Sequence, residues 1–223
     1  RASSYAEALR IADVDPRTVS AVDPTSYAAR RWVRAQGMHV LPARGFTMAE
    51  KDLQAWLGDR RPVLEEFYRH QRRRLDLLVD AHGDPEGGRW NFDADNRLPP
   101  PKGASMLGLP PPWSPVEDDI DHEVRADLDA WAASGITFVG VDASRTFAAT
   151  RHEALAALDD FVTHRLAEFG PYEDAVLRDD WVMAHSLLSV PLNLGLLDPL
   201  EVVEAAVAAY DDGAAPLQSV EAL

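Results

Sequence analysis

The sequence contains no cysteine. Such a chain forms no disulfide, offers zinc no thiolate and holds no cysteine-ligated iron–sulfur cluster of its own. It also lacks an apolar run long enough to cross a bilayer, and its first residues, Arg1–Tyr5, lack the charged start and apolar centre of a secretion signal. We therefore expect a cytoplasmic protein that is not membrane-bound and, because it begins at Arg1 rather than Met, a fragment of a longer protein.

Basic residues are scarce in the second half of the chain. Residues 113–223 carry 5 Lys+Arg against 22 Asp+Glu, whereas residues 1–112 carry 17 against 15, and the net charge of the chain is -15. An acidic surface repels phosphates, so any DNA-binding surface is expected mostly outside the C-terminal half. The overall balance, 46% hydrophobic and 26% charged residues, is typical of a globular protein.

Two short apolar runs end at prolines in the first third of the chain. Thr18–Asp23 and Met38–Leu41 are typical of buried strands, and Ser26–Gln36 between them has helical spacing with Gly37 placed to end the helix. A strand, a helix and a strand predict a parallel βαβ unit. The helix is expected to face the sheet with Tyr27, Trp32 and Val33; further helices are predicted over Tyr5–Ala12, Ala49–Leu57 and Val63–Val79.

Cations are concentrated on the last of these helices. They are Arg69, His70, Arg72, Arg73 and Arg74. Charge runs on helices usually form a solvated face, and we prefer that interpretation to a phosphate contact.

Glycine and proline interrupt regular structure between residues 83 and 118, where two runs of three prolines occur. This stretch predicts a long linker. Beyond it, helical spacing predicts helices over Val116–Ala133, Arg151–Phe169 and Leu200–Tyr210 and no strands. The expected fold is therefore α/β followed by all-α, with domains at 1–82 and 119–223 joined by the linker 83–118.

Two serines three residues apart precede Pro191 in the segment His185–Pro199. Proline favours the first turn of a helix, so Ser186 and Ser189 are expected where unpaired backbone N–H groups converge. Such a place can hold a pyrophosphate. An ordinary N-cap shows the same pattern and is commoner, so spacing alone leaves both interpretations open.

Glycines, aromatic residues and charged residues are concentrated in a second segment, Gly87–Arg97. Its acidic residues suggest the start of a calcium loop, but Arg97 and Leu98 stand where a ligand and the turn glycine belong. We expect a packed linker instead, with buried aromatic rings and ion pairs. The residues concerned are Arg89, Trp90, Phe92, Asp93, Asp95 and Arg97.

Together these segments resemble the prokaryotic photolyase-related family, the bacterial (6-4) photolyases and cryptochromes that carry an iron–sulfur cluster. Gly88–Arg97 is similar to the signature that follows the family's antenna domain, and Phe169–Asp198 resembles the start of its FAD domain. Gly213–Glu221 also resembles the family sequence. The resemblance is weak over residues 1–60 and specific from residue 87 onward. It implies the C-terminal part of a Rossmann-like parallel-sheet antenna domain, a linker, and the first helices of a helical FAD-binding domain.

The resemblance also assigns residues to the cofactor. The family segment that wraps the FAD phosphates, with its flanking positions, is matched by His185, Ser186, Leu187, Leu188, Ser189 and Asn193. The resemblance assigns no catalytic residue and no metal ligand to this sequence. The family's catalytic histidines, electron-transfer tryptophans and cluster cysteines have no counterpart here. The parent is expected to hold FAD, a lumazine-type antenna chromophore and a [4Fe-4S] cluster.

The implied function is that of a flavin-dependent photolyase. The parent would repair UV-induced (6-4) pyrimidine photoproducts by light-driven electron transfer from reduced FAD to a flipped-out lesion. It would bind damaged DNA mostly through parts absent here, so we expect this fragment alone to be inactive and monomeric. Two alternatives remain, a cryptochrome-like blue-light photoreceptor without repair activity and a truncated interaction module without flavin.

Overall fold

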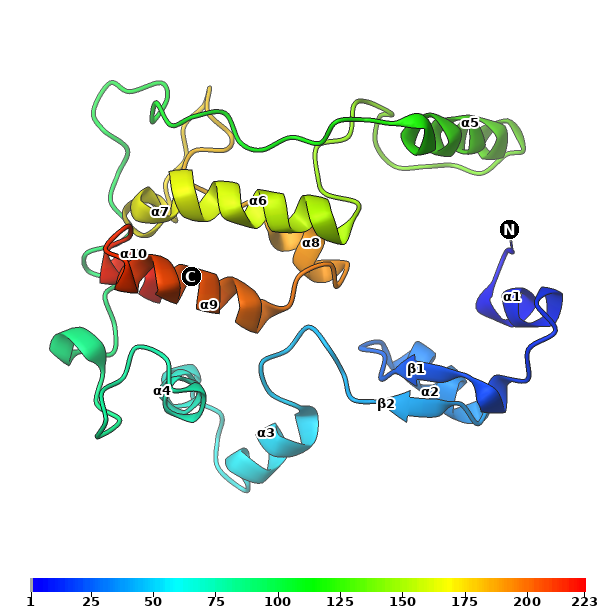
Figure 1. Cartoon of the computed structure of the whole chain (residues 1–223), viewed down its shortest axis with the longest axis horizontal. Coiled ribbons are helices and arrows are strands. Elements are labelled where there is room, and N and C mark those ends of the chain that lie inside the picture. Colours follow the sequence, from blue (N-terminus) through cyan, green and yellow to red (C-terminus); the bar gives the residue numbers. More distant parts are fainter. Residues whose placement is uncertain (1) are drawn as a thin grey trace. The chain divides into compact units, whose positions relative to one another are not determined.

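The computed structural model describes residues 2–223 and divides into two compact units. The first extends to Val63 and includes Asp198–Leu200; the second comprises Leu64–Leu197 and Glu201–Leu223. The first unit contains α1 (Tyr5–Ile11), β1 (Ser20–Val22), α2 (Tyr27–Ala35), β2 (His39–Leu41) and α3 (Glu50–Leu57) (Figure 1). The second contains α4 (Leu64–Leu75), α5 (Asp119–Ala133), α6 (Arg151–His164), α7 (Leu166–Tyr172), α8 (Ser189–Asn193), α9 (Pro199–Asp211) and α10 (Leu217–Glu221).

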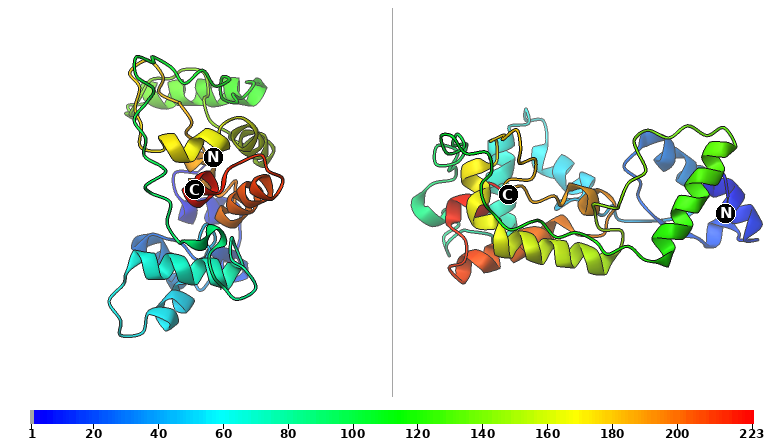
Figure 2. Two further views of the ribbon diagram at one scale, coloured as in Figure 1. Left: turned by 90° about the vertical axis from the view of Figure 1, so that its left-hand side faces the viewer. Right: turned by 90° about the horizontal axis from the view of Figure 1, so that it is seen from above.

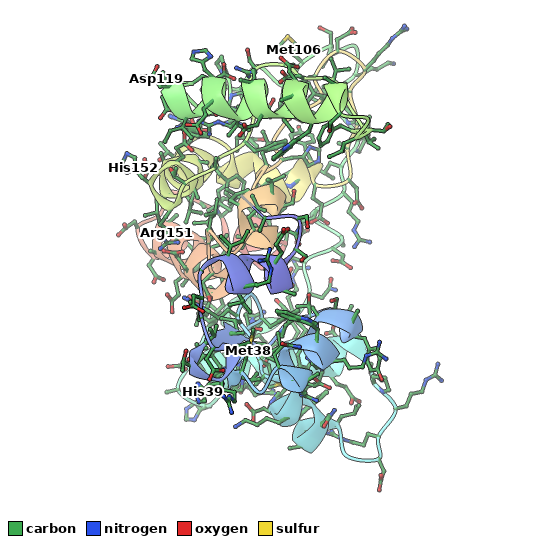
Figure 3. The ribbon with its side chains drawn as sticks, turned by 90° about the vertical axis from the view of Figure 1, so that its right-hand side faces the viewer. Met38, His39, Met106, Asp119, Arg151 and His152 are labelled. Carbon is green, nitrogen blue, oxygen red and sulfur yellow. The ribbon has the colours of Figure 1, made fainter. Side chains whose placement is uncertain are left out.

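The predicted parallel βαβ unit is confirmed. β1 pairs with β2 in parallel, with Ser20 opposite His39, which Figure 3 labels. The Ser26 hydroxyl caps α2 by accepting a hydrogen bond from the Ala29 N–H at 3.2 Å. Gly37 follows the helix with φ +71°, a conformation that glycine adopts without strain, and leads the chain into β2. Of the predicted core face, Val33 is buried and Trp32 half-buried, but the prediction is wrong for Tyr27, which is exposed.

The second unit is helical. No strand occurs in the described structure beyond residue 41, so the prediction of helices without strands over 119–223 is confirmed. Helices α6 and α9 lie side by side (Figure 2), and the core is formed mainly by apolar residues of α6, α7, α9 and α10. Its centre contains Ala154, Leu158, Phe161, Leu166, Leu188, Leu197, Val202, Ala206 and Val220. Among residues 2–223, no helix has the length and hydropathy needed to cross a membrane.

Two helices are shorter than the apolar spacing predicts. Helix α4 ends at Leu75 instead of Val79, because Asp76 (φ 56°) and Leu78 (φ 50°) adopt left-handed backbone and turn the chain away. Helix α5 begins three residues later than predicted, after Asp118, which forms a capping box with Asp121.

The helix predicted over Arg151–Phe169 is interrupted at Arg165. This residue has φ -129° and ψ -28° and separates α6 from α7. Its guanidinium turns inward, where it donates to Asp160 Oδ2 at 2.7 Å and to the Pro110 carbonyl. The break therefore depends on contacts with distant residues, and apolar spacing carries no sign of it.

Helices α7 and α10 meet at Gly170. The Gly170 N–H donates to Ser219 Oγ at 3.2 Å, and this hydroxyl donates in turn to the Ala167 carbonyl at 2.9 Å. That carbonyl has no helical partner because Pro171, four residues on, has no N–H. A Cβ atom on Gly170 would lie 2.8 Å from Ser219 Cα and 2.6 Å from Asn96 Oδ1. The junction leaves no space for a side chain.

Ion pairs tie α5 to the start of α6. Arg145 lies between the two helices, with Nε 2.8 Å from Asp121 Oδ1 and Nη1 2.8 Å from Glu153 Oε2. Hydrogen bonding to Arg145 lowers the pKa of Glu153 to about 2. Arg125 pairs with Glu117 beside them and lowers the pKa of that carboxyl to about 2 as well.

We expect the substitution Arg145→Met to lower the Tm by roughly 5 °C at neutral pH. A carboxyl whose folded-state pKa lies below its usual value of 4.5 stabilises the fold above that value and loses the contribution as pH falls. The Tm difference from wild type should therefore shrink between pH 4.5 and about 2. Thermal unfolding followed by circular dichroism measures this.

The matched control is Arg151→Met. Arg151, labelled in Figure 3, pairs with Glu201, and its side chain is 53% exposed. Exposed ion pairs contribute little, so this variant should unfold close to wild type. An Arg145→Met deficit that stays constant down to pH 2 would contradict the ionic explanation.

Candidate functional site

The six residues matched to the FAD segment lie in and before the short helix α8. Leu187 has φ 57°, a left-handed conformation uncommon for a residue other than glycine, so the chain turns sharply between Ser186 and Leu188. Leu188 is 1% exposed and belongs to the core, whereas Ser189 and Asn193 are exposed on the surface.

Of the two interpretations of the serines, the structure contradicts the ordinary N-cap. Leu188 is the N-cap of α8 and no side chain caps this helix, whereas Pro191 lies in its first turn as expected. Ser186 Oγ accepts a long hydrogen bond of 3.4 Å from the Leu188 N–H within the turn. The left-handed Leu187 explains the difference, because it reverses the chain before the helix begins.

A small pocket lies beside this turn. Its volume is about 20 Å³, room for about one water-sized group. Of the six predicted residues, His185, Ser186 and Leu187 line it, and the other three do not. The remaining wall comes from the linker, from the segment before α6, from α6 and the residue that follows it, and from α8: Pro112, Trp113, Thr146, Phe147, Ala148, Ala157, Asp160, Arg165 and Pro191.

His185 connects the turn to the preceding loop. Its Nδ1 lies 3.0 Å from the Val182 carbonyl and its Nε2 lies 3.1 Å from the Glu173 carbonyl. Both acceptors are carbonyl oxygens, and a neutral imidazole has one N–H, so only the doubly protonated ring donates to both at once. The half-buried ring thereby fixes the position of Ser186 relative to α7.

The stretch Gly87–Arg97 packs in part as predicted, since Phe92 is buried whereas Trp90 is half-buried. Phe92 is 7% exposed, and the Asn96 side chain, 3% exposed, donates to the Gln218 carbonyl at 3.0 Å. Arg89 pairs with Asp95, and Arg97 lies 3.3 Å from Glu173. In the part of the chain that the structure describes, no cluster of His, Asp and Glu residues could hold a metal ion.

The basic face of α4 is only partly solvated. Arg72 is 5% exposed and donates to the Leu77 carbonyl at 3.3 Å, and Arg73 donates to the Gly83 carbonyl at 2.9 Å. The guanidinium groups of Arg69, Arg72 and Arg73 lie 4.5 to 5.7 Å from the ring centre of Trp90. The prediction of a solvated face is therefore wrong for Arg72, because Trp90 and the turn after α4 cover it.

Helix α4 is also connected to the last helix of the chain. The Tyr68 hydroxyl donates to Glu221 Oε1 at 2.8 Å, and the Phe92 N–H donates to Glu221 Oε2 at 3.2 Å. Burial raises the pKa of Tyr68, so its hydroxyl remains a donor. One carboxylate on α10 thus holds both α4 and the linker.

Comparison with known proteins extends these observations. The family model for deoxyribodipyrimidine photo-lyase-related protein matches residues 3–157. The chain is 36% identical over 220 residues to a (6-4) photolyase from Agrobacterium fabrum, an alignment that covers 95% of this chain and 42% of the relative. The chain thus spans less than half the length of this relative. The structure agrees at a coarse level, being rich in helix with one small parallel sheet. The chain belongs to the photolyase-related family.

Proposed function

We propose that this chain is part of a flavin-dependent (6-4) photolyase. It would supply the C-terminal part of an α/β antenna domain at 1–82, a linker at 83–118 and the N-terminal part of a helical FAD-binding domain at 119–223. The observation that carries the proposal is the 36% identity to a (6-4) photolyase over nearly the whole chain.

The turn at Leu187 has features that suit contact with a phosphate group. It places the Ser186 hydroxyl in a pocket and leaves the Ser189 hydroxyl exposed at the first residue of α8. First-turn N–H groups of a helix have no intrahelical partners. This pocket is too small for a nucleotide, so it would contact only part of the cofactor. When bound in the complete protein, reduced FAD would supply the electron for light-driven repair.

DNA would be held mostly by other parts of the complete protein. Residues 113–223 are strongly acidic, and Arg72 and Arg73 already donate to backbone carbonyls of this chain. Each phosphate contact requires an available cation. We therefore expect the isolated chain to bind duplex DNA weakly.

The test compares a full-length protein carrying this sequence with the isolated chain. The full-length protein should repair a (6-4) photoproduct in a synthetic duplex under blue light and not in the dark. The isolated chain should show no repair and a duplex Kd weaker than about 100 µM at ~150 mM salt. A full-length protein that binds flavin but repairs nothing would favour the photoreceptor alternative. Micromolar duplex binding by the isolated chain would contradict the electrostatic argument and point to Arg69 and Arg73.

A further inference from the structure

An extended stretch of the linker, Leu107–Trp113, crosses the helical unit and is here called the strap. It contains neither helix nor strand and runs close to α6 and α7 (Figure 1). Its backbone is held at three places by charged side chains of the helical unit. The Leu107 N–H donates to Asp180 Oδ2 at 3.1 Å, the Pro110 carbonyl accepts from Arg165, and the Trp113 N–H donates to Asp160 Oδ2 at 3.1 Å.

The three attachment points are spaced three residues apart. Three residues is the repeat of the polyproline II helix, the conformation that proline-rich segments favour. Gly108, with φ +76°, departs from that conformation, so only the prolines between the second and third attachment points can follow it. A proline-rich strap also loses less conformational entropy on docking than a flexible one.

Arg165 is the central member of this contact. It is 2% exposed, and it joins Asp160 to the Pro110 carbonyl through two nitrogens of one guanidinium. Its third nitrogen, Nε, is buried without a hydrogen-bond partner in the described structure. The charge of Arg165 is balanced by Asp160. Arg165 therefore holds the strap in place rather than binding an anion.

The strap ends at Trp113 in the pocket wall. Trp113 packs against the core and lines the pocket beside Ser186 and Leu187. We propose that Arg165 is a positioning residue that fixes the strap and thereby holds Trp113 against the cofactor segment. This inference rests on the proposed flavin function, which it extends to the side chains that shape the site.

The test uses Arg165→Met and Arg165→Lys. Methionine fills the buried space without donors, and lysine keeps the charge without the planar fork that reaches Asp160 and Pro110 together. The matched control is Arg178→Met, which changes an exposed arginine of the same unit. In this chain, acrylamide quenching of Trp113 emission, obtained by difference from the same proteins with Trp113→Phe, reports whether the strap is docked. Circular dichroism confirms that each variant is folded.

The proposal predicts that Trp113 becomes more accessible to quencher in both Arg165 variants and that flavin content of the full-length protein falls about tenfold in Arg165→Met. Arg178→Met should change neither. Unchanged Trp113 quenching, or an exposed Trp113 with wild-type flavin content, would overturn the positioning role and leave the flavin function standing. A full-length wild-type protein without flavin would instead remove the proposed function and this inference with it.

Discussion

Replacing Gly170 by alanine is expected to destabilise the helical unit by about 3 kcal/mol and to lower its Tm by roughly 10 °C. The added Cβ would lie 2.8 Å from Ser219 Cα, closer than real Cβ atoms approach a neighbour. Because Ser219 Cα is backbone, shortening the Ser219 side chain would not relieve the contact. Helix α10 would have to move, which breaks the hydrogen bond from Gly170 N–H to Ser219 Oγ.

The matched control for this prediction is Gly195→Ala. Gly195 has φ +70° but no atom within 4 Å of an added Cβ, so the substitution costs only backbone strain, about 1 kcal/mol. Thermal and urea unfolding of both variants separate the two effects. Equal stability losses would mean that the α7–α10 junction adapts, and that the close approach at Gly170 is unimportant.

Loss of both serine hydroxyls of the cofactor segment is expected to weaken FAD binding by more than about 100-fold in the full-length protein, since each hydrogen bond to a charged acceptor contributes about 1.5–3 kcal/mol. The substitutions are Ser186→Ala and Ser189→Ala. Neither serine caps α8, so their removal should leave the helix intact and the Tm of this chain nearly unchanged. A loss of flavin is then attributable to lost contacts rather than to unfolding.

Flavin absorbance per protein measures this effect, with Ser105→Ala, an exposed hydroxyl of the linker, as control. The isolated chain should purify colourless, without the flavin band at about 450 nm, because its pocket has room for only a water-sized group. Wild-type loading of the double variant would remove these hydroxyls from the site. A yellow isolated chain would mean that it holds more of the cofactor than its pocket allows.

Local signals predicted much of the fold. Ser26 and Gly37 mark the two ends of α2, and Thr150 with Glu153 forms the capping box at the start of α6. These interactions span three or four residues, so a sequence pattern contains them completely. The βαβ unit and the helical second unit follow from such patterns together with apolar spacing.

Two of the failures involve partners outside the helix concerned. Arg165 ends α6 because it reaches Pro110, and Arg72 is buried because Trp90 and the turn after α4 cover it. Spacing within a helix contains no information about either partner. Leu187 is a different case, since it adopts left-handed backbone without being a glycine, and the N-cap interpretation of the serines is wrong for that reason.

In the candidate site, too, the residues of the local segment were predicted and the residues from other segments were not. The resemblance to photolyases named the segment, and the structure brings three of its six residues to one pocket. It could not indicate Trp113, Phe147 or Arg165, which come from other segments. The only sequence signal for Trp113 was its place directly after three prolines. A rigid proline-rich segment can fix the position of a large aromatic ring that follows it.

The hydrogen bond between Tyr68 and Glu221 also constrains the order in which contacts form while the chain is being synthesised. The two residues are 153 positions apart, so at typical rates of translation roughly 8–30 s pass between their appearance. Until Leu217–Glu221 is made, α4 and the linker lack their shared carboxylate and Gly170 lacks its partner Ser219. The helical unit therefore cannot close progressively from its N-terminus. Within the described residues, α4, the linker and α7 complete these contacts only after α10 has been made.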